Sequence, residues 1–352
     1  MLDGKGGFAR VVLLLLAGLL FALLHFSSPQ TLRTTGGGVV KTHSGGSSAF
    51  NGGSPAWEVL GEDFRQVRVF INVYRSHERA LDMVAEMLTS DLTALNFSIV
   101  VMCNWHELSF PDIEPFKSHK KSLVVIPNAP RSPRAWMGLT ARNWNLGLVR
   151  GFHDLKKPLA DVVVLCHGDL YLRPNWAVEV HKRMTEPNGL VFLSQTMGDG
   201  FMAITPLGVQ YIGMFDENFS DGGYHEGDYF LRAIAWAPPD RVSITDHHHA
   251  RFHNSHLWTG QSIVMGDGLG DSYAAGGRIP TVDPVRYSQY YWHAKWGDRD
   301  PSSWPRDTSY ARAIEKPLCP IYYLYPFFEQ GLFEHSRRGY LHDPIDHALW
   351  TF

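Results

Sequence analysis

The sequence predicts an α/β fold with a mostly parallel central sheet, helices on both faces and an additional N-terminal transmembrane helix. Three observations support this prediction. Short apolar segments rich in β-branched residues alternate with helical patterns between residues 67 and 236, an order typical of a parallel sheet. The apolar run at residues 160–166 ends at Gly168 and Asp169, as a strand buried on both faces does. Residues 11–26 are apolar and carry no full charge.

Composition describes a globular protein and limits its partners. The chain has 352 residues, 44% hydrophobic and 19% charged, which is enough for a sizeable core. A formal net charge of −3 provides no basic field for a phosphate backbone, so nucleic acid is not an expected partner. The three cysteines, Cys103, Cys166 and Cys319, have no paired spacing. We expect buried thiols rather than a disulfide framework.

The N-terminal segment is expected to meet a membrane. Residues 11–26 follow Lys5 and Arg10, and their length lies between a signal-peptide core and a span of about 20 residues. Because no clear cleavage pattern follows, we expect an uncleaved signal anchor, with residues 1–10 as a cytosolic tail. A short anchor suits the thinner membranes of the early secretory pathway, so we expect the Golgi or ER membrane.

The rest of the chain divides by composition. Residues 27–57 are rich in Gly, Ser and Thr and are expected to form a flexible stem. Residues 58–265 form the predicted globular domain, and residues 266–352 an aromatic-rich extension. This order describes a single-pass type II membrane protein with a lumenal globular domain. The glycosylation sequons at Asn96 and Asn218 fit that orientation.

The elements of the body follow from hydrophobic periodicity. A strand at residues 67–73 precedes a helix whose apolar face begins at Leu81. A final helix from Glu226 carries acidic residues in its first turn, where the helix dipole favours them. The remaining predicted elements are strands at residues 97–102, 122–126, 160–166, 190–194 and 200–205, a helical segment around residues 148–152 and a short helix that begins at Pro206.

Several segments, in order, resemble motifs of nucleotide-sugar-dependent glycosyltransferases of the GT-A fold, closest to the large inverting family 2. VFINVYR is similar to the opening strand of that family, ARNWNLGL to its A-x-N-x-G segment and LCHGDLYLRPNW to its metal-binding strand end. GMFDENF and HEGDYFLR resemble its F-D-E-x-F and E-D-x-D-x-x-x-R segments. RFHNSH resembles its late histidine segment, and YYWHAKWGDRD an element of some eukaryotic members.

The resemblance implies transfer of a sugar from a nucleoside diphosphate sugar to a hydroxyl of a glycan, protein or lipid, with inversion. It makes residues 58–265 the catalytic domain, completed on the acceptor side by residues 266–352. It makes Asp169 a metal ligand, with His167 in the place of the usual first Asp. The expected third ligand is His253, with His256 as the alternative. The expected ion is Mn²⁺ or Mg²⁺, because imidazole and carboxylate ligands tolerate both, and it would neutralise the departing diphosphate. The family usually has a nucleotide-binding Asp after the strand that here ends at Cys103, and this chain lacks it. The sequence therefore does not determine which nucleotide the donor carries.

The resemblance also assigns binding and catalytic residues. Glu226 is the expected catalytic base and Asp228 the alternative, because a carboxylate at a helix N-terminus facing the site can accept the acceptor's proton. Asp216 and Glu217 are expected to shape the loop upstream. Gly168 would let the diphosphate approach the backbone. The residues expected to contact the nucleotide sugar are Tyr74, Arg75, Asn145, Gly168 and Lys295.

Two other functions fit parts of the sequence. His167, Asp169 and a distant His have the order of the facial triad in iron and 2-oxoglutarate oxygenases. That enzyme class would need an antiparallel jelly roll and an Arg soon after the distal His, whereas the first Arg after His253 is Arg278. The second alternative is a catalytically inactive, sugar-binding relative with the GT-A fold.

Overall fold

The computed structural model describes residues 63–73, 77–103, 108–126, 140–195, 200–217, 219, 224–246, 251–267 and 292. All of them belong to Gly52–Phe352, the second of two compact units in the chain. The predicted tail, anchor and stem lie outside the described residues. Within the described part, every helix is too short or too polar to cross a membrane.

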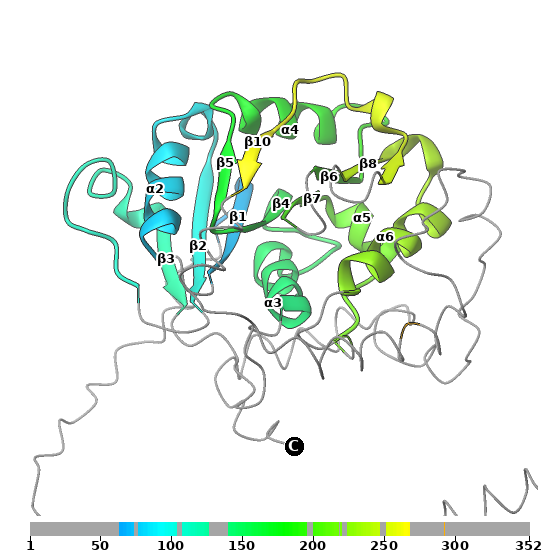
Figure 1. Ribbon diagram of the computed structural model, residues 1–352, viewed down its shortest axis with the longest axis horizontal. Coiled ribbons are helices and arrows are strands. Elements are labelled where there is room, and N and C mark those ends of the chain that lie inside the picture. The colour runs from blue at the N-terminus through cyan, green and yellow to red at the C-terminus, as the bar shows by residue number, and fades with distance from the viewer. Residues whose placement is uncertain are drawn as a thin grey trace, which may run out of the picture. The chain divides into compact units, whose positions relative to one another are not determined.

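The centre of the described unit is an eight-stranded sheet with the order β3-β2-β1-β4-β7-β6-β8-β9 (Figure 1). The predicted parallel arrangement is confirmed for β3, β2, β1 and β4, and β6 is parallel to β8. The strands are β1 (Arg65–Val73), β2 (Phe97–Cys103), β3 (Leu123–Ile126), β4 (Ala160–His167), β6 (Phe192–Gln195), β7 (Phe201–Ile204), β8 (Val242–Asp246) and β9 (Arg251–His253).

The sheet is mixed where the connections are short. β7 runs antiparallel to both β4 and β6, and β9 runs antiparallel to β8. Only residues 196–200 separate β6 from β7. A parallel pair needs a crossover of a dozen residues or more, so this connection forces an antiparallel hairpin. Strand and helix alternation alone did not predict that reversal.

The predicted helices are present and pack on both faces of the sheet (Figure 1). Thr205 caps the short helix through a hydrogen bond from the Gly208 N–H, and Pro206 is its first residue, as predicted. The helices are α2 (His77–Leu88), α3 (Thr140–Phe152), α4 (Trp176–Thr185), α5 (Pro206–Ile212) and α6 (His225–Trp236), with short 3₁₀ helices η2 (Asp91–Ala94), η3 (Lys120–Ser122), η4 (Pro239–Arg241) and η5 (Ser255–Leu257).

Two apolar cores lie on opposite faces of the sheet because side chains alternate along each strand. From β1, Val69 and Ile71 join the core that contains α2 and α4, whereas Phe70 joins the core that contains α3 and α6. Cys103 and Cys166 are buried as expected, and burial raises the pKa of the Cys103 thiol to about 11. Gly151 lets α3 approach the sheet, because a Cβ atom there would lie 2.3 Å from Val163.

A separate two-stranded sheet lies beside the α2 face. It pairs β5 (Leu170–Leu172) with β10 (Val264–Asp267) in antiparallel register. Neither strand was predicted, because segments this short show no clear periodicity. β10 also crosses the expected boundary between residues 265 and 266.

Candidate functional site

The strand order places a ligand-binding edge at β1 and β4. The chain passes outward from β1 to β2 and β3, then returns to the other side of β1 as β4. Open α/β sheets bind ligands at the carboxyl ends of strands where the order reverses in this way. Asn72 near the end of β1 is in register with His167 at the end of β4. Asp169 follows two residues later, so the predicted metal-binding segment lies at this reversal.

The first turns of α3 hold the two strand ends in place. Asn143 donates a hydrogen bond from Nδ2 to Oδ1 of Asn72 at 2.9 Å. The next residue, Trp144, packs against the His167 ring with 5.5 Å between centroids. Both α3 residues are fully buried. The His167 imidazole is therefore oriented by packing rather than left as a mobile strand end.

Gly168 is required by packing. A Cβ atom at this position would lie 2.8 Å from Cγ2 of Val73 and 3.1 Å from Cβ of Ala80. The space that a side chain would need at Gly168 is thus filled by β1 and α2. Its N–H donates to the Asn72 carbonyl at 3.0 Å, which ties the turn to the end of β1.

His167 and Asp169 are suitable donors for a divalent cation, since an imidazole and a carboxylate suit both Mn²⁺ and Mg²⁺. Asp169 is 7% exposed, so a cation there would be partly shielded from water. Among the described side chains, no group of three His, Cys, Asp or Glu residues is placed to hold a metal.

The sheet order argues against His253 as the third ligand. His253 ends β9, the edge strand, and only its backbone is described. β7, β6 and β8 separate β9 from β4, a distance of roughly 19 Å at the usual strand spacing. That distance is too long for an imidazole and a carboxylate to share one cation. His256, the alternative third ligand, is exposed in η5, which contacts β8.

The two acidic residues of α6 have different surroundings. Asp228 is fully buried and accepts a hydrogen bond from Nε of Arg232 at 2.9 Å, with Nη2 of Arg232 2.8 Å from the same oxygen. This buried ion pair argues against Asp228 as the alternative base. Glu226 keeps 17% of its side chain exposed, and His225 Nδ1 lies 3.5 Å from its Oε2 atom. Within the described residues, that buried oxygen accepts no hydrogen bond.

The turn before α6 is strained and covered by an aromatic residue from the C-terminal segment. Tyr224 precedes the helix with a φ of 70°, a left-handed conformation that is unfavourable for a bulky side chain. Its ring lies 5.8 Å from the ring of Trp292, which lies 6.3 Å from that of Phe219. Trp292 is buried, so this residue of the aromatic-rich extension acts in packing.

The side-chain amide of Asn145 is hydrogen-bonded within the fold, whereas the sequence predicts a contact with the nucleotide sugar. Its Oδ1 and Nδ2 atoms both hydrogen-bond to Phe215, and Nδ2 also donates to Glu217. Burial raises the pKa of Glu217. From the sequence, Glu217 was expected only to shape the loop. Its surroundings could not be predicted, because the residues that bury it are distant in the chain.

Three expected nucleotide-sugar contacts, Tyr74, Arg75 and Lys295, lie outside the described residues.

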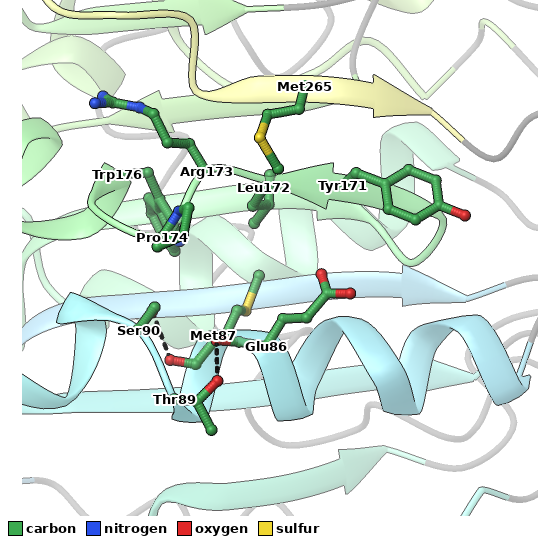
Figure 2. A pocket seen from close by; sticks show the side chains of 10 residues that line it. All are labelled: Glu86, Met87, Thr89, Ser90, Tyr171, Leu172, Arg173, Pro174, Trp176 and Met265. Carbon is green, nitrogen blue, oxygen red and sulfur yellow. Dashed lines mark hydrogen bonds between the residues drawn. The ribbon is translucent and has the colours of Figure 1, made fainter.

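A pocket of about 250 Å³ lies elsewhere, between the end of α2 and the β5-β10 sheet. Figure 2 shows Met265 and Leu172 on one side of this pocket and Glu86 and Met87 from α2 on the other. None of the predicted site residues lines it. The chemistry expected from the sequence is therefore not associated with this pocket but with the strand ends described above.

In comparisons of sequence, no protein-family model and no curated protein matches the chain. In comparisons of structure, the chain is similar to the mannosyltransferase PcManGT from Pyrobaculum calidifontis in complex with GDP-Man and Mn²⁺, with 12% identity, a TM-score of 0.34 and coverage of 84% of this chain and 89% of that one.

Two further structures are similar. One is the glucosyl-3-phosphoglycerate synthase from Mycobacterium tuberculosis, with 11% identity, a TM-score of 0.36 and coverage of 65% of this chain and 82% of that one. The other is GalNAc-T7 with UDP, GalNAc and Mn²⁺, with 11% identity, a TM-score of 0.37 and coverage of 71% of this chain and 54% of that one. Because these TM-scores are below 0.5, the α/β assignment rests on the strand order of the chain itself.

Proposed function

We propose that the protein is a metal-dependent glycosyltransferase of the GT-A type that moves a sugar from a nucleoside diphosphate sugar to a hydroxyl acceptor, with inversion. The observation that carries this proposal is the reversal of strand order between β1 and β4. It brings Asn72 and His167 into register and places Asp169 directly after them. The opening-strand, A-x-N-x-G and metal-binding-strand segments that resemble the glycosyltransferase family thus meet at the edge where an α/β sheet binds nucleotides.

The residues at this edge have the roles that the reaction needs. His167 and Asp169 would hold a divalent cation, which supplies positive charge beside the diphosphate when it is bound. Trp144 fixes the orientation of His167, and Asn143 fixes the end of β1 through Asn72. A carboxylate would accept the acceptor's proton, and Glu226 in the first turn of α6 is the candidate that the sequence suggests.

A donor screen tests the proposal. The full-length protein is incubated with common nucleoside diphosphate sugars and Mn²⁺, and the released nucleoside diphosphate is measured with and without simple glycan acceptors. We expect release with at least one donor and its loss in Asp169→Asn, which keeps the side-chain volume but removes the charge. If sugar nucleotides bind to the wild-type protein but none is consumed, the inactive sugar-binding relative is the better assignment.

The fold does not support the oxygenase alternative. That enzyme class requires strands paired antiparallel in a jelly roll, whereas β3, β2, β1 and β4 are parallel and covered by helices. The distance of β9 from β4 also separates His253 from the other two members of the supposed triad.

We further propose a type II orientation in the Golgi or ER membrane, anchored by residues 11–26. The sequon residue Asn96 lies exposed at the start of β2, which suits a lumenal glycan. Expression in animal cells followed by glycosidase digestion tests the orientation. We expect the wild-type protein to show a form that glycosidase digestion shifts, and the double variant Asn96→Gln/Asn218→Gln to lack it. If the wild-type protein has no such form, lumenal exposure of both sequons is contradicted.

A further inference from the structure

Three hydrogen bonds from one side chain join α3 to the segment that follows α5. Oδ1 of Asn145 accepts from the Phe215 N–H at 2.7 Å, and Nδ2 donates to the Phe215 carbonyl at 2.9 Å. The same Nδ2 atom donates to Oε1 of Glu217 at 2.8 Å. Asn145 is 2% exposed, so water does not compete for these bonds. The Glu217 carboxyl therefore has a defined place relative to α3, although it lies outside any helix or strand.

The surroundings of Glu217 disfavour its charged form. Burial is the largest effect and raises its pKa, the Asn145 hydrogen bond and the Arg142 guanidinium lower it by less, and the Asp216 carboxylate adds the smallest effect, an increase. Asp216 is itself fully buried. Arg142 and Asp216 are the charged groups that act on Glu217 in the described part of the chain. An ionised Glu217 consequently destabilises the folded protein near neutral pH.

Local structure does not require a carboxylate at this position. A glutamine would accept the same hydrogen bond from Asn145 without a charge to desolvate. The ion pairs found among the described residues do not include Glu217, whereas Asp228 nearby has its partner in Arg232. A carboxyl group that is held in place although its charge lowers stability is typical of functional sites.

Glu217 is linked through Asn145 to the part of α3 that contacts the ends of β1 and β4. On α3, the two residues before Asn145 contact those ends, since Asn143 bonds to Asn72 and Trp144 packs on His167. In Figure 1, the arrowheads of β2 and β3 point toward the lower side of the picture, where α3 lies. The segment that Asn145 holds leads into α6, which begins next to Glu226.

We propose that Glu217 is the carboxylate that accepts the proton of the acceptor hydroxyl, and that Asn145 is the residue that positions it. This inference rests on the proposed function. As the acceptor oxygen forms its bond to the anomeric carbon, its proton passes to Oε2 of Glu217, the oxygen that does not accept from Asn145. The bond from the anomeric carbon to the diphosphate breaks, and its electron pair leaves with the diphosphate.

The choice of Glu217 over Glu226 follows from the requirements of a base. A general base is most effective when its proton affinity matches the working pH, and burial adjusts a carboxyl in that direction. Glu226 lies in the first turn of α6 beside His225, where it is suited to bind a hydroxyl of the acceptor. Its replacement is expected to weaken acceptor binding more than the chemical step.

The test compares Glu217→Gln with Glu226→Gln in the full-length protein, using a donor that the wild-type protein consumes. Glu186→Gln is the matched control, because Glu186 directly follows α4 and its partly exposed side chain pairs with Arg183. We expect Glu217→Gln to slow transfer by about 100-fold or more, with the donor Kd changed by less than about twofold. Glu226→Gln should raise the acceptor KM, and the control should match the wild type.

A pH profile separates a positioning role for Asn145 from a purely structural one. Its hydrogen bond lowers the pKa of Glu217, so Asn145→Ala should move the acidic limb of the transfer rate to higher pH. A loss of rate at all pH values without that movement would overturn the positioning role. Transfer by Glu217→Gln at a rate near that of the wild type would overturn the role of Glu217 while leaving the proposed function intact. If the wild-type protein consumes no donor, both proposals fail.

Thermal unfolding tests the state of Glu217 without an activity assay. The folded-state pKa lies above the ordinary value of 4.5, so the wild-type protein loses stability as pH rises through the folded-state pKa. Glu217→Gln lacks this loss. We expect a higher Tm than wild type at about pH 8 and an equal Tm at about pH 4. An equal Tm at both pH values would show that Glu217 is well solvated and would overturn the inference.

Discussion

Asp228 and Glu226 lie in the same turn of α6 but differ in burial and in their partners. Asp228 points into the core of the protein and pairs with Arg232, whose Nη1 also donates to the Ile212 carbonyl at 2.5 Å. Glu226 stays partly exposed at the surface of the same turn. The pair of Asp228 and Arg232 therefore connects α6 to the end of α5, and its removal should affect folding more than chemistry.

The buried pair predicts a large loss of stability for Asp228→Ala. Removing one partner leaves the Arg232 guanidinium charged and buried, which costs about 3 to 5 kcal/mol of unfolding free energy. Urea unfolding measures this change. Glu186→Ala, which removes the partly exposed pair with Arg183, should cost less than about 1 kcal/mol. Similar losses for the two variants would contradict the structural role of Asp228.

Gly168 predicts a stability effect that its expected role in diphosphate binding would not produce. In Gly168→Ala the new methyl group meets Val73 and Ala80, so we expect a loss of about 1 to 3 kcal/mol from overpacking. Gly266→Ala is the control, because its Cβ atom would meet only Tyr171, at an ordinary 3.7 Å. Denaturant unfolding compares the two. If Gly168→Ala lost donor affinity at unchanged stability, the original interpretation of this glycine would hold.

At the scale of elements, α4 depends on a cap supplied from another part of the chain. Its own N-cap residue, Asn175, makes no side-chain capping bond. Instead, the Asp91 carboxylate accepts from the Ala177 N–H at 3.1 Å and from the Val178 N–H at 2.8 Å. The start of η2 therefore completes the first turn of α4, and the two elements should lose stability together.

The cap predicts that Asp91→Ala destabilises the protein by about 0.5 to 2 kcal/mol, the usual range for a lost N-cap. Asn175→Ala should leave the free energy of unfolding nearly unchanged, since the Asn175 side chain makes no capping hydrogen bond. Equilibrium unfolding in urea measures both variants. A larger loss for Asn175→Ala than for Asp91→Ala would show that capping is local to α4 after all.

At the scale of the whole molecule, the reversal between β1 and β4 gathers residues that are far apart in the sequence. Asn72, Asn143 and His167 meet at one edge of the sheet, with Asp169 directly beyond. A ligand that binds this edge would contact several elements of the fold at once. Its binding free energy should therefore add to the stability of the whole unit.

The proposed cation site predicts stabilisation by ligand. At a concentration of about 100 times Kd, donor and Mn²⁺ together should add about 2.7 kcal/mol to the unfolding free energy. The measurement is the Tm with donor, with and without Mn²⁺, followed by addition of a chelator, which should reverse the shift. Asp169→Asn should show little or no response to Mn²⁺. A shift equal to that of the wild type would exclude Asp169 as a ligand.

Much of the fold was predictable because strands and helices leave local patterns. Strand β1 and helices α5 and α6 lie where hydrophobic periodicity and the Pro206 start signal predict them. The antiparallel β7 and the short β5 and β10 were not predictable, because strand direction depends on connection length and on partners elsewhere in the chain. The same holds for the site. Asp169 was predicted because it follows the end of a strand, whereas the hydrogen bonds of Asn145 to Phe215 and Glu217 could not be predicted from the sequence.

The sequence by itself determined the class of fold, the edge of the sheet at which chemistry is expected and the residues His167, Asp169 and Glu226 as candidates. Only the tertiary structure decided that Asp228 is paired, that Gly168 is packed and that Glu217 is half-buried and hydrogen-bonded to Asn145. The physical reason is that periodicity is a property of neighbouring residues. Burial and charge pairing are properties of the space that distant segments enclose together.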